Sequence, residues 1–272
     1  MIKLAIVVVV LIVVLIVALA VVARLLEPRF AFFPGTGDTP PPAEPGVQIT
    51  AWSVATSDGE RLQGWSLEPE STRATVLYFH GNGGNLSVWE PILTGLARRG
   101  FAVVAFDYRG YGASTGRPTE QGLYRDVEAV VERFRALPRR PLPVVYWGRS
   151  LGTAMAAYAT TLAAPDGVIL ESGFPDARSI TRTSPVLAVL AVFSSYRFPT
   201  AEFMRRSAAP LPALVMHGDS DSVVPFELGR SLFARINERK TFMTIRGGDH
   251  NDAVPADPAY WPQVDRFVAG LR

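Results

Sequence analysis

The chain has 272 residues, of which 48% are hydrophobic, and a formal net charge of +2 at pH 7. This composition fits one full-sized folded domain and excludes an intrinsically disordered chain. The basic residues are scattered rather than clustered in a stripe, so we expect no nucleic-acid partner. The sequence contains no cysteine, and its histidines form no helical pair at ligand spacing, so we expect no disulfide and no metal site.

Residues 4–23 consist only of Leu, Ile, Val and Ala. As a helix this run would be about 30 Å long, enough to cross a bilayer core. We therefore predict a retained, single-pass membrane anchor over residues 1–26. A cleaved signal peptide is the alternative, because residues 18–20 have the A-x-A form. Lys3 precedes the run and Arg24 and Arg29 follow it, which nearly balances the flanking charges; we expect the domain that follows to be extracytoplasmic.

Residues 27–46 are rich in Pro and Gly and predict a stiff tether, and residues 47–272 then form one α/β domain. Apolar runs of strand length alternate with amphipathic stretches, which is typical of a mostly parallel sheet flanked by helices. The eight expected strands cover residues 48–54, 61–67, 74–79, 101–106, 144–147, 167–170, 213–216 and 241–245, and the expected helices cover 86–99, 120–136, 151–162, 226–237 and 260–271. Asp58-Gly59 predicts a hairpin turn between the first two strands.

A Gly-x-Ser-x-Gly pentapeptide, Gly148 to Gly152, lies between an expected strand and an expected helix. A turn of this kind exposes a serine hydroxyl and brings the N–H of the next residue close to it. Ser150 is therefore the candidate nucleophile, and the N–H of Leu151 is a candidate oxyanion donor. Such pentapeptides also occur by chance, so the prediction depends on whether the partner residues follow in the order serine, acid, histidine.

Only one of the three histidines, His250, lies where that order requires the general base. Between Ser150 and His250, the loop after residues 213–216 offers Asp221, which we predict to orient the imidazole. Asp219, which we expect to shape the loop, and Glu171 are the alternative acids.

The glycine-rich tract of residues 80–85 follows another expected strand. Its backbone N–H groups could stabilise an oxyanion, and Asn82 is the predicted donor that pairs with Leu151. His80 and Gly81 are predicted supporting residues, and His80 and His217 are expected to orient loops rather than transfer protons. The tract has no lysine and lacks the spacing of a phosphate-binding loop.

Two further segments have alternative interpretations. Residues 107–116 form a polar, glycine-rich loop that we expect to be structural, with Arg109 paired to a carboxylate; contact with an anionic substrate is the alternative. Residues 174–210 are expected to include a short lid over the nucleophile, and an ordinary crossover helix is the alternative. If they form an apolar lid, charged substitutions at Leu187 and Leu190 should impair turnover of long-chain esters and spare acetyl esters.

These blocks together resemble the α/β-hydrolase superfamily, and within it the BEM46-like (ABHD13/ABHD17-like) membrane-anchored serine hydrolases. The resemblance covers residues 48–271 and includes the blocks 77–85, 107–116, 148–152, 217–225 and 248–251. It departs from the expected pattern at Gly173, which stands where a proline is expected. The resemblance implies an α/β-hydrolase fold, no cofactor, and a carboxylesterase, lipase or thioesterase acting on lipid-like or membrane-associated acyl substrates. A serine peptidase and a non-catalytic membrane scaffold are the alternatives.

Overall fold

The fold was determined from a computed structural model that describes residues 2–37, 40–138, 141–183, 194–207, 211–236 and 239–271. In chain order, its elements are α1 (Ile2–Ala31), β1 (Phe33–Pro34), β2 (Val47–Ala55), β3 (Arg61–Pro69), β4 (Ala74–Phe79), β5 (Gly83–Gly84), α2 (Leu86–Arg98), β6 (Phe101–Phe106), α3 (Glu120–Ala136), β7 (Val144–Arg149), α4 (Leu151–Leu162), β8 (Gly167–Glu171), α5 (Ala177–Thr181), α7 (Thr200–Arg206), β9 (Ala213–Gly218), α8 (Phe226–Arg235), β10 (Lys240–Ile245) and α9 (Tyr260–Ala269).

Eight strands form one sheet in the order β10-β9-β8-β7-β4-β6-β3-β2. The β2–β3 and β3–β6 pairs are antiparallel, and the other pairs are parallel. The predicted mostly parallel sheet of eight strands is therefore confirmed. The predicted hairpin joins β2 to β3, and Gly59 adopts a φ of +91° in its turn, a conformation that a residue with a Cβ rarely adopts.

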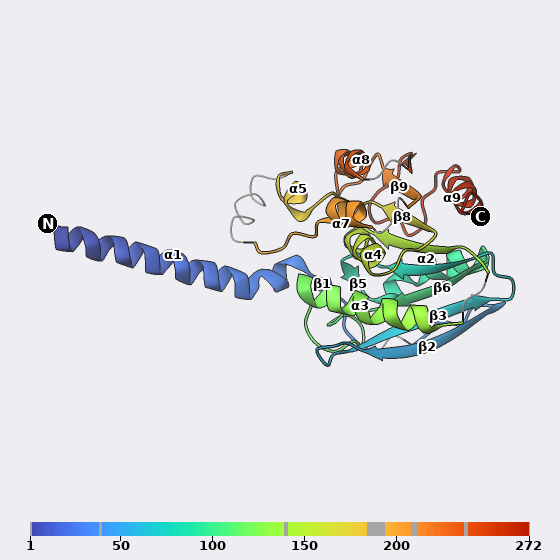
Figure 1. The fold of residues 1–272 in the computed structure, drawn as a ribbon, viewed down its shortest axis with the longest axis horizontal. Helices are drawn as coiled ribbons and strands as arrows, with labels where there is room; N and C mark the ends of the chain where they lie inside the picture. Colours follow the sequence, from blue (N-terminus) through green and yellow to red (C-terminus); the bar gives the residue numbers. More distant parts are fainter. Residues whose placement is uncertain are drawn as a thin grey trace.

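Helices cover both faces of the sheet (Figure 1). Side chains of α3, α4, α7 and α8 share one core cluster with Leu77 and Phe79, whereas α2 and α9 share the other with Val76 and Tyr78. Alternate residues of β4 thus point to opposite helical layers, which is why this strand is an almost continuous apolar run. The carboxyl ends of the parallel strands meet at one edge of the sheet, where the loops that carry polar residues converge.

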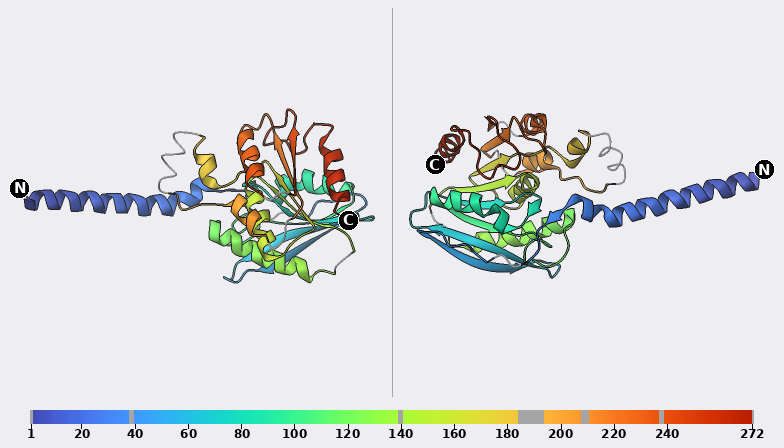
Figure 2. Two further views of the ribbon diagram at one scale, coloured as in Figure 1. Left: turned by 45° about the horizontal axis from the view of Figure 1, so that its top comes forward. Right: turned by 180° about the vertical axis from the view of Figure 1, so that it is seen from behind.

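Helix α1 projects away from the domain as a single rod in all three views (Figures 1 and 2). It continues to Ala31, beyond the predicted anchor, with Pro28 in its last turns. Within the residues that the structure describes, no helix offers a stretch both long and apolar enough for a bilayer crossing. The predicted span includes Leu4, Leu19 and Ala23, whose side chains are outside the described set.

The segment after α1 packs on the domain, whereas the sequence predicts a stiff tether over residues 27–46 that is not a folded element. Phe32 is only 3% exposed and belongs to the main core cluster, and β1 pairs in parallel with β5. Thr36 forms a further bridge to Gly112. Burial of the Phe32 ring and pairing with β5 therefore fix to the domain a segment whose composition indicates only a stiff tether.

The predicted lid region contains two short helices, α5 and α7, in its described part. Helix α7 packs through Ala201 and Met204 in the same core cluster as α4. Residues 184–193 and 208–210, which include Leu187 and Leu190, lie outside the described residues. The prediction of an apolar lid therefore stays a prediction.

Candidate active site

Ser150 lies at the sharp turn between β7 and α4. Its φ of +54° is rare for a residue that has a Cβ, and such strain is typical of functional sites. The N–H of Ser150 donates to the carbonyl of Glu171 at 2.9 Å, which ties the turn to the neighbouring strand. A Cβ at Gly148 would overlap the carbonyl of Gly152, and a Cβ at Gly152 would overlap the carbonyl oxygen of Phe79. Both glycines are thus required by the close approach of backbones around the turn.

His250 connects the serine to a carboxylate. Its Nε2 lies 3.0 Å from Ser150 Oγ, and its Nδ1 lies 2.9 Å from Asp221 Oδ2. A carboxylate only accepts hydrogen bonds, so Nδ1 carries the proton and Nε2 is left to accept from the serine hydroxyl. The structure therefore brings Ser150, His250 and Asp221, from three separate loops, into one hydrogen-bonded chain in the orientation that proton transfer requires.

The environment of Asp221 favours its charged form. Burial of the carboxyl raises its pKa, but hydrogen bonds from His217, His250 and the N–H of Val224, together with the charge of His250, hold the pKa well below its usual range. Oδ1 accepts the N–H groups of Val223 at 3.0 Å and Val224 at 2.7 Å. This carboxylate is therefore fixed in place and ionised at neutral pH.

His217 is the second histidine that contacts Asp221 Oδ2. Its Nε2 donates to the carbonyl of Val224 at 2.8 Å and lies 3.3 Å from Asp221 Oδ2. The side chain is fully buried. It holds the loop that carries the acid, as the sequence analysis expects.

The two alternative acids lie elsewhere. Asp219 accepts the N–H of Gly247 at 2.7 Å, so it joins the loops after β9 and β10. Glu171 lies beneath the turn, where it accepts hydrogen bonds from Trp147 Nε1 and the Tyr260 hydroxyl, both at 3.0 Å. Neither carboxylate contacts His250 within the described part of the chain.

The glycine-rich tract of residues 80–85 lies beside the serine. A Cβ at Gly81 would lie 3.4 Å from Ser150 Cβ. Asn82 follows Gly81 directly, so its N–H lies in the peptide unit next to this contact. The N–H of Leu151 is in the first turn of α4, where backbone donors have no acceptor within the helix. The two predicted donors thus belong to the two segments that adjoin the nucleophile, the glycine-rich tract and the first turn of α4.

Two tyrosine hydroxyls bind the backbone of this tract, and neither role was predicted from the sequence. The Tyr108 hydroxyl donates to the carbonyl of His80 at 3.0 Å. The Tyr111 hydroxyl lies 3.0 Å from the carbonyl of Asn82 and 2.8 Å from its Oδ1. Their loop, residues 107–116, is expected from the sequence to be structural. The signal that could have indicated their role is that both tyrosines follow β6, which is adjacent to β4, the strand that leads into the tract.

Arg109, in the same loop, forms ion pairs with two carboxylates. It binds Asp126 through Nε and Asp58 through Nη1, both at 2.8 Å. Its side chain is buried, and it joins the β2–β3 hairpin to α3. The structural interpretation of Arg109 therefore agrees with the geometry.

Arg149, directly before the serine, is a third residue whose role the sequence did not indicate. Its Nη2 donates to the carbonyls of His250 at 2.9 Å and Asp252 at 2.5 Å, and its Nε lies 3.8 Å from Glu171 Oε1. The side chain is buried. Arg149 therefore fixes the loop of His250 relative to the serine turn, and only its position inside the pentapeptide could have suggested this.

His80 is buried among aromatic rings, and its ring centroid lies 4.4 Å from that of Tyr108. Nδ1 donates to the carbonyl of Gly81 at 2.7 Å, whereas Nε2 has no hydrogen-bond partner within the described residues. Burial lowers the pKa of His80 to about 4, although the Gly81 carbonyl opposes the shift. His80 is therefore neutral at pH 7 and supports the glycine-rich tract.

This burial predicts a pH dependence of stability. The unfolded chain binds a proton at His80 below its ordinary pKa of 6.5, but the folded chain does so only near 4. The free energy of unfolding should therefore fall as the pH decreases from 6.5 towards 4, by up to about 3 kcal/mol from this group. Urea unfolding at several pH values checks this: wild type should lose more stability across the window than His80→Gln. Equal slopes for the two proteins would contradict it.

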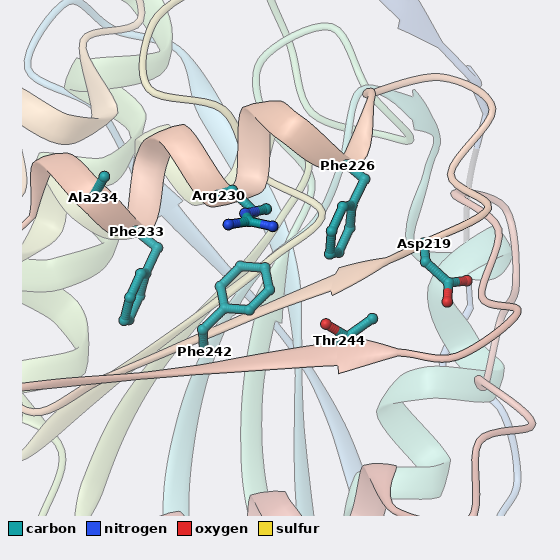
Figure 3. A pocket seen from close by; sticks show the side chains of 7 residues that line it. All are labelled: Asp219, Phe226, Arg230, Phe233, Ala234, Phe242 and Thr244. Atoms are coloured by element: carbon teal, nitrogen blue, oxygen red, sulfur yellow. The ribbon is translucent and has the colours of Figure 1, made fainter.

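A groove between α8 and β10 is separate from the serine site (Figure 3). Phe226 and Phe233 of α8 pack against Phe242 of β10, with ring centroids 5.8 and 5.4 Å apart, and Arg230 lies between them in the close-up. Neither Ser150 nor His250 lines this groove. Its aromatic rings pack α8 against the edge strand β10.

An eight-stranded, mostly parallel sheet with polar loops at the carboxyl ends of its strands defines the class of α/β-hydrolases. The chain belongs to the hydrolase family described as "Serine aminopeptidase, S33", whose model it matches over residues 70–210.

The chain is also similar to individual proteins. The chain is 33% identical to "Uncharacterized protein YfhR" of Escherichia coli (strain K12) over 217 residues, which cover 76% of this chain and 73% of that protein. It is 35% identical to "Lysophosphatidylserine lipase ABHD12" of Mus musculus over 185 residues, which cover 60% of this chain and 45% of that protein. The Pyrococcus furiosus esterase Pf2001 has the same fold, with a TM-score of 0.67 at 18% identity over 88% of this chain and 98% of that one.

Proposed function

We propose that the protein is a serine hydrolase that cleaves acyl ester or thioester bonds through Ser150, His250 and Asp221. The observation that carries the proposal is the hydrogen-bonded chain from Ser150 Oγ through His250 to Asp221 Oδ2. Its setting beside the glycine-rich tract supports it, because acyl transfer needs a nucleophile, a base and oxyanion donors within one site.

In the proposed acylation, Ser150 Oγ attacks the substrate carbonyl carbon and its proton moves to His250 Nε2. The N–H groups of Asn82 and Leu151 stabilise the resulting oxyanion, and losing one such donor typically costs about 3 kcal/mol. The tetrahedral intermediate collapses as His250 gives its proton to the leaving alcohol or thiol, which leaves an acyl group on Ser150. Asp221 stabilises the imidazolium formed at each step.

Deacylation uses the same groups in reverse. A water molecule gives a proton to His250 Nε2 and its oxygen attacks the acyl-enzyme carbonyl. Collapse of the second intermediate returns the proton to Ser150 Oγ and releases a carboxylic acid. No cofactor enters either half of this proposed reaction.

We further propose a lipid-like acyl substrate. Val88, Val223 and Val254 are 61%, 53% and 45% exposed. Val88 lies against Gly84 of the glycine-rich tract, and the other two belong to the loops that carry Asp221 and His250. The start of α2 and the two loops thus expose apolar side chains close in sequence to the site residues. The lysophosphatidylserine lipase relatives support the same substrate class, and we propose that the protein belongs to the BEM46-like branch.

A panel of esters and thioesters of increasing acyl length, with a peptide amide panel beside it, tests this function. We expect ester or thioester turnover whose kcat/KM rises with chain length, because each buried methylene adds about 0.8 kcal/mol. Cleavage of amides alone would instead favour the serine peptidase alternative. Absence of turnover on every substrate would favour a non-catalytic scaffold.

We also propose that α1 attaches the protein to a membrane, with the N-terminus cytoplasmic and the domain outside. The support is a helix of 30 residues whose side chains from Ile6 to Val17 are apolar and exposed. A topology reporter fused after Arg272 should be active only outside the cytoplasm. Activity only in the cytoplasm would overturn the orientation, and recovery of the full chain in the soluble fraction would overturn the attachment.

A further inference from the structure

The segment that follows α1 contacts the glycine-rich tract directly. Asn82 Nδ2 donates to the carbonyl of Ala31, the last residue of α1, at 2.7 Å. In the β1–β5 ladder Phe33 is opposite Gly83 and Pro34 is opposite Gly84. The N–H of Gly35 then donates to the carbonyl of Gly84 at 2.7 Å. Residues 31–35 therefore contact the tract from Asn82 to Gly84, next to Gly81, which approaches Ser150.

The same segment also contacts the loop of residues 107–116, which carries Tyr108 and Tyr111. The N–H of Gly112 donates to the carbonyl of Gly35 at 2.7 Å, and the N–H of Gly37 donates to the carbonyl of Gly112 at 3.0 Å. Tyr111, one residue earlier, contacts Asn82 and also the backbone of Phe33. The N-terminal segment, the tract and the tyrosine loop thus form one continuous hydrogen-bonded layer.

Phe32 and Glu27 fix this segment to the domain. The Phe32 ring is buried against Tyr196 and Phe198, with centroid separations of 5.4 and 6.3 Å. The Glu27 carboxylate accepts hydrogen bonds from the hydroxyls of Ser194 and Ser195 and from the N–H of Ser195. The end of α1 is therefore joined to the glycine-rich tract on one side and to the crossover before α7 on the other.

We infer that residues 31–35 are a positioning element that holds the oxyanion donor of Asn82 in place. The inference rests on the proposed function. Three of the six residues from 80 to 85 are glycines, whose backbone loses more conformational freedom on ordering than that of any other residue. Within the described residues, β5 has no ladder partner other than β1. Without β1, the tract would keep its hydrogen bonds to Tyr108 and Tyr111 but lose the pairing of Gly83 and Gly84 with residues 33–35.

Phe32→Ala in the full chain tests this inference, with Leu25→Ala as the control. Phe32 is 3% exposed and anchors the segment, whereas Leu25, in α1 and outside residues 31–35, is 73% exposed. Active sites are first counted by the end point of fluorophosphonate labelling. For a short, soluble ester, Phe32→Ala should lower kcat per active site by about 10- to 100-fold, below the 10²- to 10³-fold loss of a whole donor. KM should stay within about twofold.

An alkylboronic acid supplies the readout that a purely structural role would not change. It forms a tetrahedral adduct on the serine and so imitates the oxyanion intermediate. Its inhibition constant should rise in Phe32→Ala by the same factor by which kcat falls, and Leu25→Ala should match wild type in both.

Gly35→Ala keeps the inference testable if Phe32→Ala does not fold. Its backbone is not left-handed, and the added Cβ would lie 3.1 Å from the carbonyl carbon of Gly84, so only a small shift of the tract is imposed. A smaller loss in the same direction is expected. Wild-type kcat in either folded variant, or equal changes in KM and in boronate binding, would overturn the inference. Wild type that neither labels nor hydrolyses would instead overturn the proposed function.

Discussion

Ser150→Ala should lower kcat by roughly a millionfold while the protein stays folded. The hydroxyl is the group that would form the covalent bond to the acyl carbon, and alanine leaves His250 nothing to deprotonate at that position. The backbone keeps a φ of +54° at this turn, so alanine meets the same strain as serine. Single-turnover kinetics with an activated ester would measure the loss, and thermal unfolding would show that the fold is kept.

The control for this variant is Ser87→Ala. Ser87 lies at the start of α2, and its hydroxyl donates only to Asn85 Oδ1, at 2.6 Å, within the described contacts. We expect a change in kcat of less than a few-fold. If Ser150→Ala retained a tenth or more of wild-type turnover, Ser150 would not be the nucleophile.

Asp221→Asn should lower kcat by about 10⁴-fold, with little change in KM. The carboxylate accepts from His250 Nδ1 at 2.9 Å. An amide that accepts the N–H groups of Val223 and Val224 through its oxygen must point its NH₂ at His250. That donor forces the proton of the imidazole onto Nε2, which can then no longer accept from Ser150. Steady-state kinetics across pH measures the effect.

Because His217 also contacts Asp221, the Asp221→Asn variant should lose stability as well as activity. The NH₂ of an asparagine at position 221 would also face His217 Nε2, which lies 3.3 Å from the carboxylate oxygen in the wild type. Two donors would then meet without an acceptor, so we expect the free energy of unfolding to fall by about 1–3 kcal/mol. A kcat near the wild-type value would show that another group orients His250.

The fold and the contacts of Ser150, His250 and Asp221 follow closely from local sequence. Strands such as 74–79 and 101–106 are apolar runs bounded by turn residues, and the structure has them with the same bounds. The serine, acid and histidine could be selected because the chain has few histidines and because the carboxyl ends of parallel strands must meet. These are constraints of order and topology that a sequence carries directly.

The contacts that support this site could not be obtained in the same way. Arg149 reaches the carbonyl of His250 across a separation of 101 residues, and Asn82 reaches Ala31 across 51. Both are side-chain to backbone bonds, which have no sequence signature beyond the side chain itself. The composition of residues 27–46 predicts a stiff tether, because Pro and Gly content indicates local backbone properties but not that β1 pairs with β5.

Fluorophosphonate labelling followed by mass spectrometry of the modified peptide tests the central claim most directly. Ser150 Oγ should displace fluoride and form a stable phosphonyl adduct, so wild type should label at one site, within residues 148–152. Ser150→Ala should not label at all, and His250→Ala should label far more slowly because its serine has no base. Labelling of a different serine in wild type, or no labelling together with intact ester turnover, would contradict the assignment of Ser150 as nucleophile.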